Sequence, residues 1–294
     1  MKKHKDFDIW LHDDGELSGI HGADVASRET LRCWPLSLVE RVTFGDGAIR
    51  IYKAYHNLPV ESEFYRKARS RHIPALYYSH SEGDRHWLLL EYIEGRQPAG
   101  LGIARTIDLA RQVREVINRL DSVDCVRHDL SQDHYENFVQ ATYNLLSDLN
   151  NKKQLVKTDV EAIERIRDAM TCPEVLRAVN GRNGLLHGDM KCDNIILRPD
   201  GDIVIIDWLN VMRGPPDIDL YSLLATQGID PVPVAGIGPE ILRMALEMRW
   251  FADCLNCWMP FPAFLDGRIA IIEEHMRRVV KHNGYAGAGV YYFH

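Results

Sequence analysis

The stretch LLHGDMKCDNIILRPDGDIVIIDW, residues 185–208, is the most informative part of the sequence. Short apolar runs flank its Asp-Gly pair at 200–201, a pattern that predicts a β-hairpin. Asp189 and Asn194 precede the first run, and Asp207 follows the second. The hairpin therefore brings Asn194 back toward Asp207. Two carboxylates and an amide placed in this way can hold a hard divalent cation and leave one carboxylate to orient a nucleophile.

The same stretch resembles the HGDxxxxN catalytic loop and metal-binding Asp of the aminoglycoside phosphotransferase and choline kinase-like family, which has the protein-kinase fold. The resemblance implies that Asp189 orients the acceptor hydroxyl and accepts its proton, with Lys191 beside the transferred phosphate. It implies that Asn194 and Asp207 ligate Mg²⁺ between the nucleotide phosphates. His187 is expected to hold the loop by hydrogen bonds rather than take part in the chemistry.

The first ninety or so residues predict a strand-rich region with one helix. SLVERVTF (37–44) and AIRIYKAY (48–55) alternate around an Asp-Gly turn, which predicts a hairpin. A helix is expected over residues 60–74, ending before Pro74. The runs ALYYSH and HWLLLEYIEG predict two more strands, and the second leads into a short linker.

The chain after residue 100 predicts helices on both sides of the 185–208 stretch. Apolar residues recur at spacings of three and four between Leu109 and Leu120, as on an amphipathic helix. We therefore expect an α+β protein with a β-rich lobe at 1–94, a hinge at about 91–98 and a mainly helical lobe at 95–294. The resemblance implies that the first lobe binds the nucleotide and that the second is catalytic and binds the acceptor. Further helices are expected at residues 132–149, 158–180, 217–226, 239–258 and 264–282.

Other parts of the family's nucleotide site can be matched upstream. Lys53 matches the lysine that anchors the phosphates, and Glu63 in the next helix matches the acid that holds this lysine. Taken alone, Lys53 is more simply an exposed strand residue and Glu63 a solvated helix charge, so the assignment depends on their order relative to the loop. Glu91, Tyr92 and Ile93 lie in LLLEYIEG, which resembles the strand and hinge that cradle the base of ATP or GTP.

Some expected parts are missing or ambiguous. A Gly-rich phosphate loop has no clear match: the turn CWPLS (33–37) has no glycine, and SGIHG (18–22) lies far from Lys53. Asp219 in GPPDIDLYSLL resembles an Asp that braces the catalytic loop. The CxxC formed by residues 254–257 lies in an amphipathic helix, and without a second pair we interpret it as packing rather than a zinc site.

Composition excludes several classes of protein. The 294 residues are 46% hydrophobic and carry a net charge of −7, without the basic patch of a nucleic-acid binder. No apolar run is long enough to span a membrane, and MKKHKDFDIW lacks the apolar core of a secretory signal. Six scattered cysteines suit a reducing compartment, so a cytoplasmic location is expected.

The resemblance implies a phosphotransferase that uses ATP or GTP with Mg²⁺ and acts on a hydroxyl of a small molecule. Gly188 stands where regulated protein kinases carry an Arg, and the segment after Asp207 is too short for a regulatory activation loop. A protein kinase and a non-catalytic nucleotide-binding protein remain as alternatives. Nearly balanced C-terminal charges favour an acceptor of mixed polarity over a polycationic aminoglycoside. Candidate residues for the acceptor pocket are Trp250, Phe251, Trp258, Phe261 and Phe264.

Overall fold

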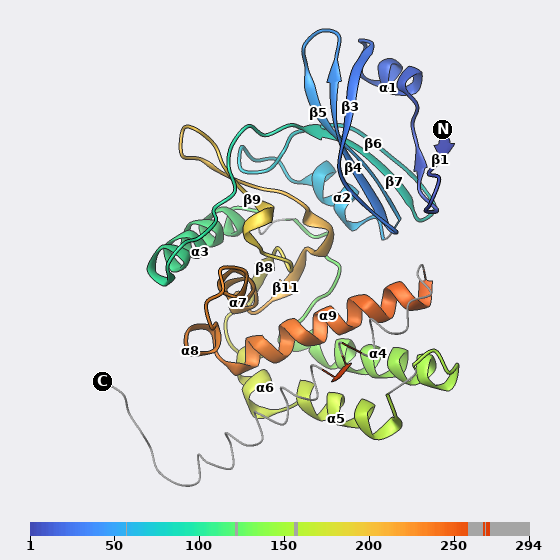
Figure 1. Cartoon of the computed structure of the whole chain (residues 1–294). Helices are drawn as coiled ribbons and strands as arrows, with labels where there is room; N and C mark the ends of the chain where they lie inside the picture. Colours follow the sequence, from blue (N-terminus) through green and yellow to red (C-terminus); the bar gives the residue numbers. More distant parts are fainter. Residues whose placement is uncertain (57, 121–122, 156–157, 258–266, 268, 271–294) are drawn as a thin grey trace. The chain divides into compact units, whose positions relative to one another are not determined.

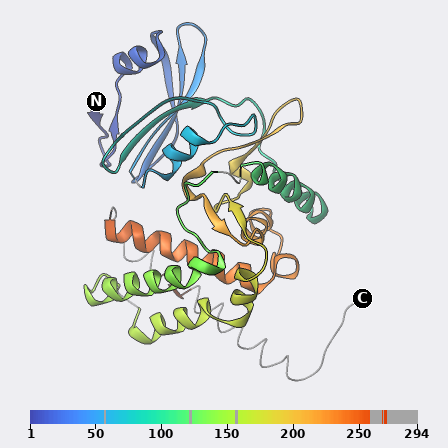
Figure 2. The same ribbon diagram turned by 180° about the vertical axis from the view of Figure 1, so that it is seen from behind.

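The computed structural model describes residues 1–56, 58–120, 123–155, 158–257, 267 and 269–270 (Figures 1 and 2). The chain forms two compact units. The first comprises Met1–His128 and Leu185–Met212, and the second comprises Asp129–Gly184 and the chain from Arg213 onward. The lobe boundary predicted at residues 94 and 95 stays a prediction. The helix expected over 264–282 lies almost entirely outside the described residues.

A five-stranded antiparallel sheet forms the centre of the first unit, in the order β3-β4-β5-β7-β6. The predicted hairpin is confirmed, since β4 and β5 pair on either side of the Asp-Gly turn. The two later strands are also confirmed as β6 and β7. The bounds are β3 (Val25–Trp34), β4 (Ser37–Phe44), β5 (Ile49–His56), β6 (Leu76–Glu82) and β7 (Arg85–Glu91).

The two faces of this sheet have different surroundings. One face, which we call the covered face, carries Leu38, Val42, Tyr52 and Ala54, all buried in one apolar cluster with residues of the N-terminal segment. The opposite face carries Val39 and Ile51, which are half-buried, and Lys53. We call it the lysine face. Side chains alternate between the two faces along a strand, so consecutive residues of β4 or of β5 lie in different environments.

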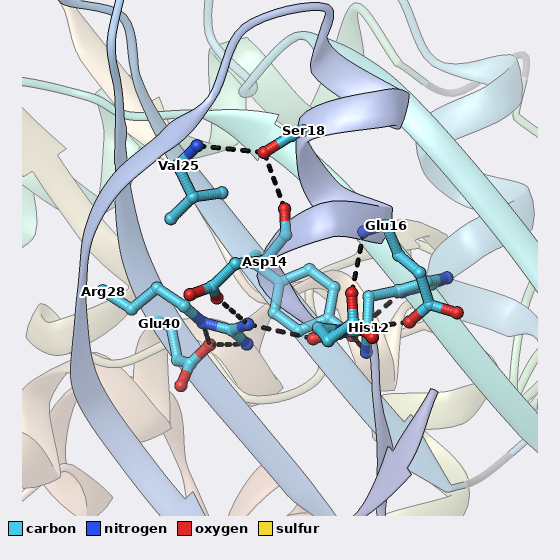
Figure 3. Close-up of polar contacts among 9 residues, drawn as sticks. His12, Asp14, Glu16, Ser18, Val25, Arg28 and Glu40 are labelled. Carbon is cyan, nitrogen blue, oxygen red and sulfur yellow. Dashed lines mark hydrogen bonds and ion pairs between the residues drawn. The ribbon is translucent and has the colours of Figure 1, made fainter.

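The N-terminal segment holds the covered face through polar contacts as well as apolar ones (Figure 3). It contains β1 (Lys2–Lys3), β2 (Trp10–Leu11) and α1 (Asp14–His21). Asp13 and Glu16 form a capping box at the start of α1. Arg28 of β3 donates to Glu40 of β4 and to Asp14, at 3.1 Å in the latter case. The candidate loop SGIHG is the end of α1, so it belongs to the covered face and is excluded as a phosphate loop.

The predicted helix after β5 is shorter than expected. Helix α2 (Val60–Lys67) ends because Ala68 is extended, with φ −72° and ψ 132°. The remainder of the first unit contains α3 and the hairpin of β9 and β10, which the sequence also predicts. The bounds are α3 (Ile103–Asn118), β8 (Gly184–Leu186), η1 (Cys192–Asn194), β9 (Ile195–Leu197), β10 (Ile203–Ile205), η2 (Trp208–Asn210) and β11 (Met212–Gly214).

The second unit is helical over its described residues. Helix α9 packs against α4, α5, α6 and α7. The single helix expected over 158–180 is two helices, because Pro173 takes the first position of α6 and cannot continue α5. The bounds are α4 (Gln132–Asn151), α5 (Val160–Met170), α6 (Pro173–Val179), α7 (Asp217–Thr226), α8 (Val232–Ala235) and α9 (Ile237–Cys257).

Among the described helices, none combines the length and the apolar character that crossing a bilayer requires.

Candidate active site

The first unit brings together a buried lysine and two carboxylates from three separate segments. Lys53 of β5 is 7% exposed. Its Nζ lies 2.8 Å from Oε1 of Glu61 on α2 and 2.7 Å from Oδ1 of Asp207, which follows β10. A buried ammonium group needs such partners, because its desolvation would otherwise be very costly. Lys53 therefore links the sheet, α2 and the β9–β10 hairpin.

The partner of Lys53 on α2 is Glu61, so the assignment of Glu63 to this role is wrong. Two residues along a helix differ by about 200°, so the two glutamates lie on nearly opposite sides of α2. Glu61 is fully buried and Glu63 is half-buried. The sequence did contain the signal, because Glu61 stands three and four residues before the buried Phe64 and Tyr65. Residues at that spacing share one helix face.

The three charges have different protonation behaviour. Burial raises the pKa of Glu61 to about 7, against the opposing effect of Lys53. Although burial opposes it, the nearby Lys53 ammonium holds the pKa of Asp207 below its ordinary value. The carboxylates of Asp207 and Glu61 likewise outweigh burial and raise the pKa of Lys53. The Lys53–Asp207 pair is therefore favoured in its ionised form, and burial makes Glu61 the weaker acid of the two carboxylates.

The loop between β8 and η1 is held by His187 and Gly188. The His187 ring is fully buried, and its Nδ1 accepts from the Asp189 backbone N–H at 3.3 Å. Because Nδ1 accepts, Nε2 carries the hydrogen and donates to the Ile206 carbonyl at 2.9 Å. Gly188 has φ +79°, and a Cβ there would lie 2.1 Å from the Asn210 carbonyl oxygen. Only glycine fits this close approach, which explains the His-Gly-Asp order.

The charged and polar residues of the loop contact one another. The Lys191 ammonium lies 2.8 Å from the Asp189 carboxylate. Asn194 is buried, and its amide N–H donates to the Asp189 carbonyl at 2.8 Å. The Asn194 carbonyl accepts from the Ile206 N–H at 3.0 Å, directly before Asp207. The prediction that the hairpin brings Asn194 toward Asp207 is therefore confirmed at the level of the backbone.

Asp207 has a backbone conformation that is uncommon for a residue other than glycine. Its φ of 63° and ψ of 60° are left-handed, a conformation that aspartate tolerates better than most residues. The next residue, Trp208, stacks on Phe64 of α2 with ring centroids 4.2 Å apart and donates its indole N–H to the Ile205 carbonyl. This packing holds Asp207 in place, and such strained residues cluster at functional sites.

The predicted hinge is tied to the β9–β10 hairpin. Glu91 accepts from the Ala75 N–H and from the Arg198 guanidinium at 2.9 Å, so its side chain is used in structural contacts. Arg96 and Leu197 exchange two backbone hydrogen bonds. Tyr92 is half-buried and Ile93 is buried. The role of residues 91–93 in cradling a nucleotide base stays a prediction.

The turn before the predicted hairpin contains no glycine, as the sequence indicates. Residues Pro35 and Leu36 connect β3 to β4, and Trp34 pairs with Ser37 across the turn. The Trp34 indole N–H donates to the Ser37 hydroxyl. The sequence predicts a turn here, but its pattern does not predict β3, which precedes the turn.

The residues expected in the second unit are only partly described. Trp250 and Phe251 lie on α9 in an edge-to-face contact, with ring centroids 4.9 Å apart. Trp258, Phe261 and Phe264 lie outside the described residues. Asp219 is buried in the first turn of α7. An acceptor pocket at the aromatic residues and a bracing role for Asp219 stay predictions.

Asp207 and Asn194 could contribute oxygen ligands to a cation that is also bound by a ligand. Within the described ranges, no three or more His, Cys, Asp or Glu side chains gather as a metal site. The Asp207 side chain is 30% exposed, so its carboxylate remains accessible beside Lys53. Magnesium commonly takes one or two protein oxygens and completes its shell with phosphate oxygens and water. This donor set fits magnesium better than a metal held by protein ligands alone.

The sequence matches the model of the phosphotransferase enzyme family over residues 49–251. Solved structures with the same fold include the macrolide 2′-phosphotransferase MphH from Brachybacterium faecium, at 16% identity and a TM-score of 0.56, with 86% of this chain and 96% of that chain covered. The ADP-bound aminoglycoside phosphotransferase APH(2″)-Ib shows 17% identity and a TM-score of 0.55, with coverages of 90% and 98%.

A third structure is the streptomycin–ATP–APH(2″)-IIa complex, at 20% identity and a TM-score of 0.53, with coverages of 82% and 91%. At these identities the likeness establishes the fold. The α+β class predicted from the sequence is confirmed.

Proposed function

Because the chain belongs to the phosphotransferase enzyme family, we propose that it transfers the γ-phosphate of ATP to a hydroxyl group of a small molecule in the presence of Mg²⁺. The observation that carries this proposal is the cluster of Lys53, Glu61 and Asp207 beside the Asp189 loop. A lysine buried between two carboxylates, next to a strained and accessible aspartate, is arranged to meet a charged ligand. Nucleotides in the ADP-bound and ATP-bound relatives support ATP as the donor.

Four residues would bind the nucleotide and its cation. Lys53 would contact the phosphates, and Glu61 would hold the ammonium in position. Asp207 and Asn194 would present oxygen atoms to the cation. When bound, Mg²⁺ supplies positive charge that offsets the charge developing on the phosphates during transfer.

Asp189 would act on the acceptor. Its carboxylate would accept the hydroxyl proton while the acceptor oxygen forms its bond to phosphorus and the bond to the ADP oxygen breaks. Lys191, at 2.8 Å, holds this carboxylate in the loop and can approach the transferred phosphate. The buried His187 acts through its two hydrogen bonds, which fix the direction of the loop.

The complete set of residues favours an enzyme over a non-catalytic nucleotide-binding protein. A protein acceptor is less favoured. Regulated protein kinases carry a long activation loop after the metal-binding Asp, whereas here only β11 and short connections lie between η2 and α7. Solved relatives bound to streptomycin or gentamicin support a small acceptor. The balanced charges of the C-terminal part support a hydroxylated acceptor of mixed polarity.

A screen for acceptor-dependent ADP release with MgATP tests this function. Hydroxylated metabolites, sugar derivatives, macrolides and aminoglycosides would be compared, with casein as a protein acceptor and Asp207→Ala as the inactive control. We expect release with at least one small acceptor and none with the variant. Phosphate transfer to casein alone, or nucleotide binding without turnover of any acceptor, would contradict the proposal.

A further inference from the structure

A β-bulge in β3 changes which face of the sheet its side chains reach. Thr30 pairs with Glu40 of β4, but Arg32 pairs with Val39, so Leu31 is an extra residue. Without the bulge, Arg32 would share the covered face with Thr30. With it, Arg32 moves to the lysine face. Bulges often redirect a side chain beside a functional site in this way.

The strand register aligns Arg32 with Lys53. Arg32 pairs with Val39, and Val39 pairs with Lys53 on the next strand. Directly paired residues project from the same side of a sheet, and neighbouring strands lie about 4.8 Å apart. The two backbones are therefore about 10 Å apart, a span that long cationic side chains on one face can bridge through a ligand.

The Arg32 guanidinium is held at the turn end of β3. It lies over the Trp34 ring, 5.9 Å from its centroid, and Trp34 is in turn bonded to Ser37. Arg32 is exposed, and within the part of the chain that the structure describes it forms no ion pair.

The Pro35–Leu36 turn cannot provide the amide-rich cradle that glycine loops offer to phosphates. Pro35 has no N–H, and no glycine occurs between Val25 and Phe44. Lys53 is also shared between Glu61 and Asp207, so its charge is already offset. The Mg²⁺ of the proposed function offsets part of the charge of a nucleoside triphosphate, and a further cationic side chain on the lysine face would offset more of it. Arginine can provide one with paired donors matched to phosphate oxygens.

We infer that Arg32 is the phosphate-covering residue of this chain, and that its guanidinium takes the place of a glycine-rich loop. This inference rests on the proposed function, since it concerns the phosphates of the same nucleotide. It also explains the bulge at Leu31, which serves to move Arg32 from the covered face to the lysine face.

Binding of MgATP and of adenosine to Arg32→Gln tests the inference by calorimetry. The matched control is Arg41→Gln, which removes a positive charge from the same face, one cross-strand row away, where Arg41 is paired with Glu29 at 2.7 Å. Loss of a charge-assisted hydrogen bond predicts about tenfold weaker MgATP binding for Arg32→Gln. Adenosine binding should be unchanged in both variants, and Arg32→Lys should give an intermediate loss.

Four results would overturn the inference. One is equal MgATP affinity in Arg32→Gln and Arg41→Gln. Another is an equal loss of MgATP and adenosine binding, which would place Arg32 at the base or in the fold. If the unsubstituted protein binds no MgATP, the proposed function fails together with the inference. If it binds MgATP and Arg32→Gln binds MgATP with unchanged affinity, the inference alone fails.

Discussion

The two faces of the five-stranded sheet show how one set of strands can serve stability and chemistry together. On the covered face, Tyr52 and Ala54 are fully buried in an apolar cluster with the N-terminal segment. Between them in sequence, Lys53 points to the other face and meets two carboxylates. The covered face gains from the removal of apolar surface from water. The lysine face instead keeps charges that only pairing or a ligand can stabilise.

Charged side chains also have different surroundings on the two faces. On the covered face Arg28 meets Glu40 and Asp14 in contacts that connect the N-terminal segment to β3 and β4 (Figure 3). On the lysine face Asp207 is accessible and its backbone is left-handed. The difference predicts that substitutions on the covered face lower stability, and substitutions on the lysine face lower activity.

The largest expected effect is that of Asp207→Ala. Loss of the carboxylate beside Lys53 removes a ligand of the proposed cation, a contribution of several kcal/mol to the transition state, so kcat should fall by a factor of about a thousand or more. Steady-state ADP release would measure it, with circular dichroism as the check on folding. Near-normal turnover by a folded variant would contradict the role of Asp207.

Asp189→Asn should come next. Proton acceptance by a positioned carboxylate contributes roughly a hundredfold to ten-thousandfold, and Asp189 would touch the acceptor rather than the nucleotide. We therefore expect kcat to fall within that range while the Kd of MgATP stays unchanged. A parallel loss of nucleotide affinity would show that Asp189 belongs to the nucleotide site.

On the covered face, Arg28→Ala should lower the free energy of unfolding by about 2 kcal/mol, because Glu40 would lose its charged hydrogen-bond donor. Glu40 is buried and cannot recover this contact from water at full strength. Urea titration would measure the change. The KM for ATP and kcat of the folded variant should stay within twofold of the original. A large change in either would contradict the prediction that the covered face contributes to stability and not to activity.

A smaller effect is expected from Glu61→Gln, with Glu63→Gln as its matched control on the same helix. Glu61 holds the Lys53 ammonium, so its loss should weaken MgATP binding about tenfold, the size of one charge-assisted contact. Glu63→Gln should bind MgATP normally. A larger loss of MgATP binding in Glu63→Gln than in Glu61→Gln would instead support Glu63 as the partner of Lys53, as predicted from the sequence.

The smallest effect should be a pH dependence on the covered face. Burial among Tyr52, Tyr78 and Trp87 lowers the pKa of His12, against the effect of Glu16 and with that of Arg28 and His80. The unfolded chain then binds a proton more readily, so stability is lost as pH falls below the ordinary histidine pKa of about 6.5.

Substitution of His12 by Gln should reduce this acid sensitivity in urea titrations at pH 5.5 and 7.5. An unchanged pH dependence would show that other groups are responsible. His56 is one such group, since burial lowers its pKa as well.

Local signals explain most of what the sequence predicted correctly. The Asp-Gly turns of β4–β5 and β9–β10 depend on adjacent residues and their alternation, and both hairpins were found. Strand β3 was missed because bulges near Val25 and at Leu31 interrupt its alternation. Regular alternation of apolar and polar residues is the main sequence signal for a strand, so a strand whose alternation is interrupted is not predicted.

The candidate site required information from distant parts of the chain. Lys53 and Asp207 contact each other across 154 positions, and only the resemblance to a known family connected them. Glu63 was assigned from its place ten residues after Lys53, without knowledge of which face of α2 is buried. Arg32 could not be assigned from sequence, because its face depends on a register shift that appears only when β3 and β4 are paired.

The most direct test of the account is transfer of radiolabelled γ-phosphate from ATP to a small hydroxylated acceptor, measured with and without Mg²⁺ for the original protein and for Asp207→Ala. The account predicts a labelled small-molecule product that requires both Mg²⁺ and Asp207. Transfer that persists in the folded variant, or a label found only on protein, would contradict it.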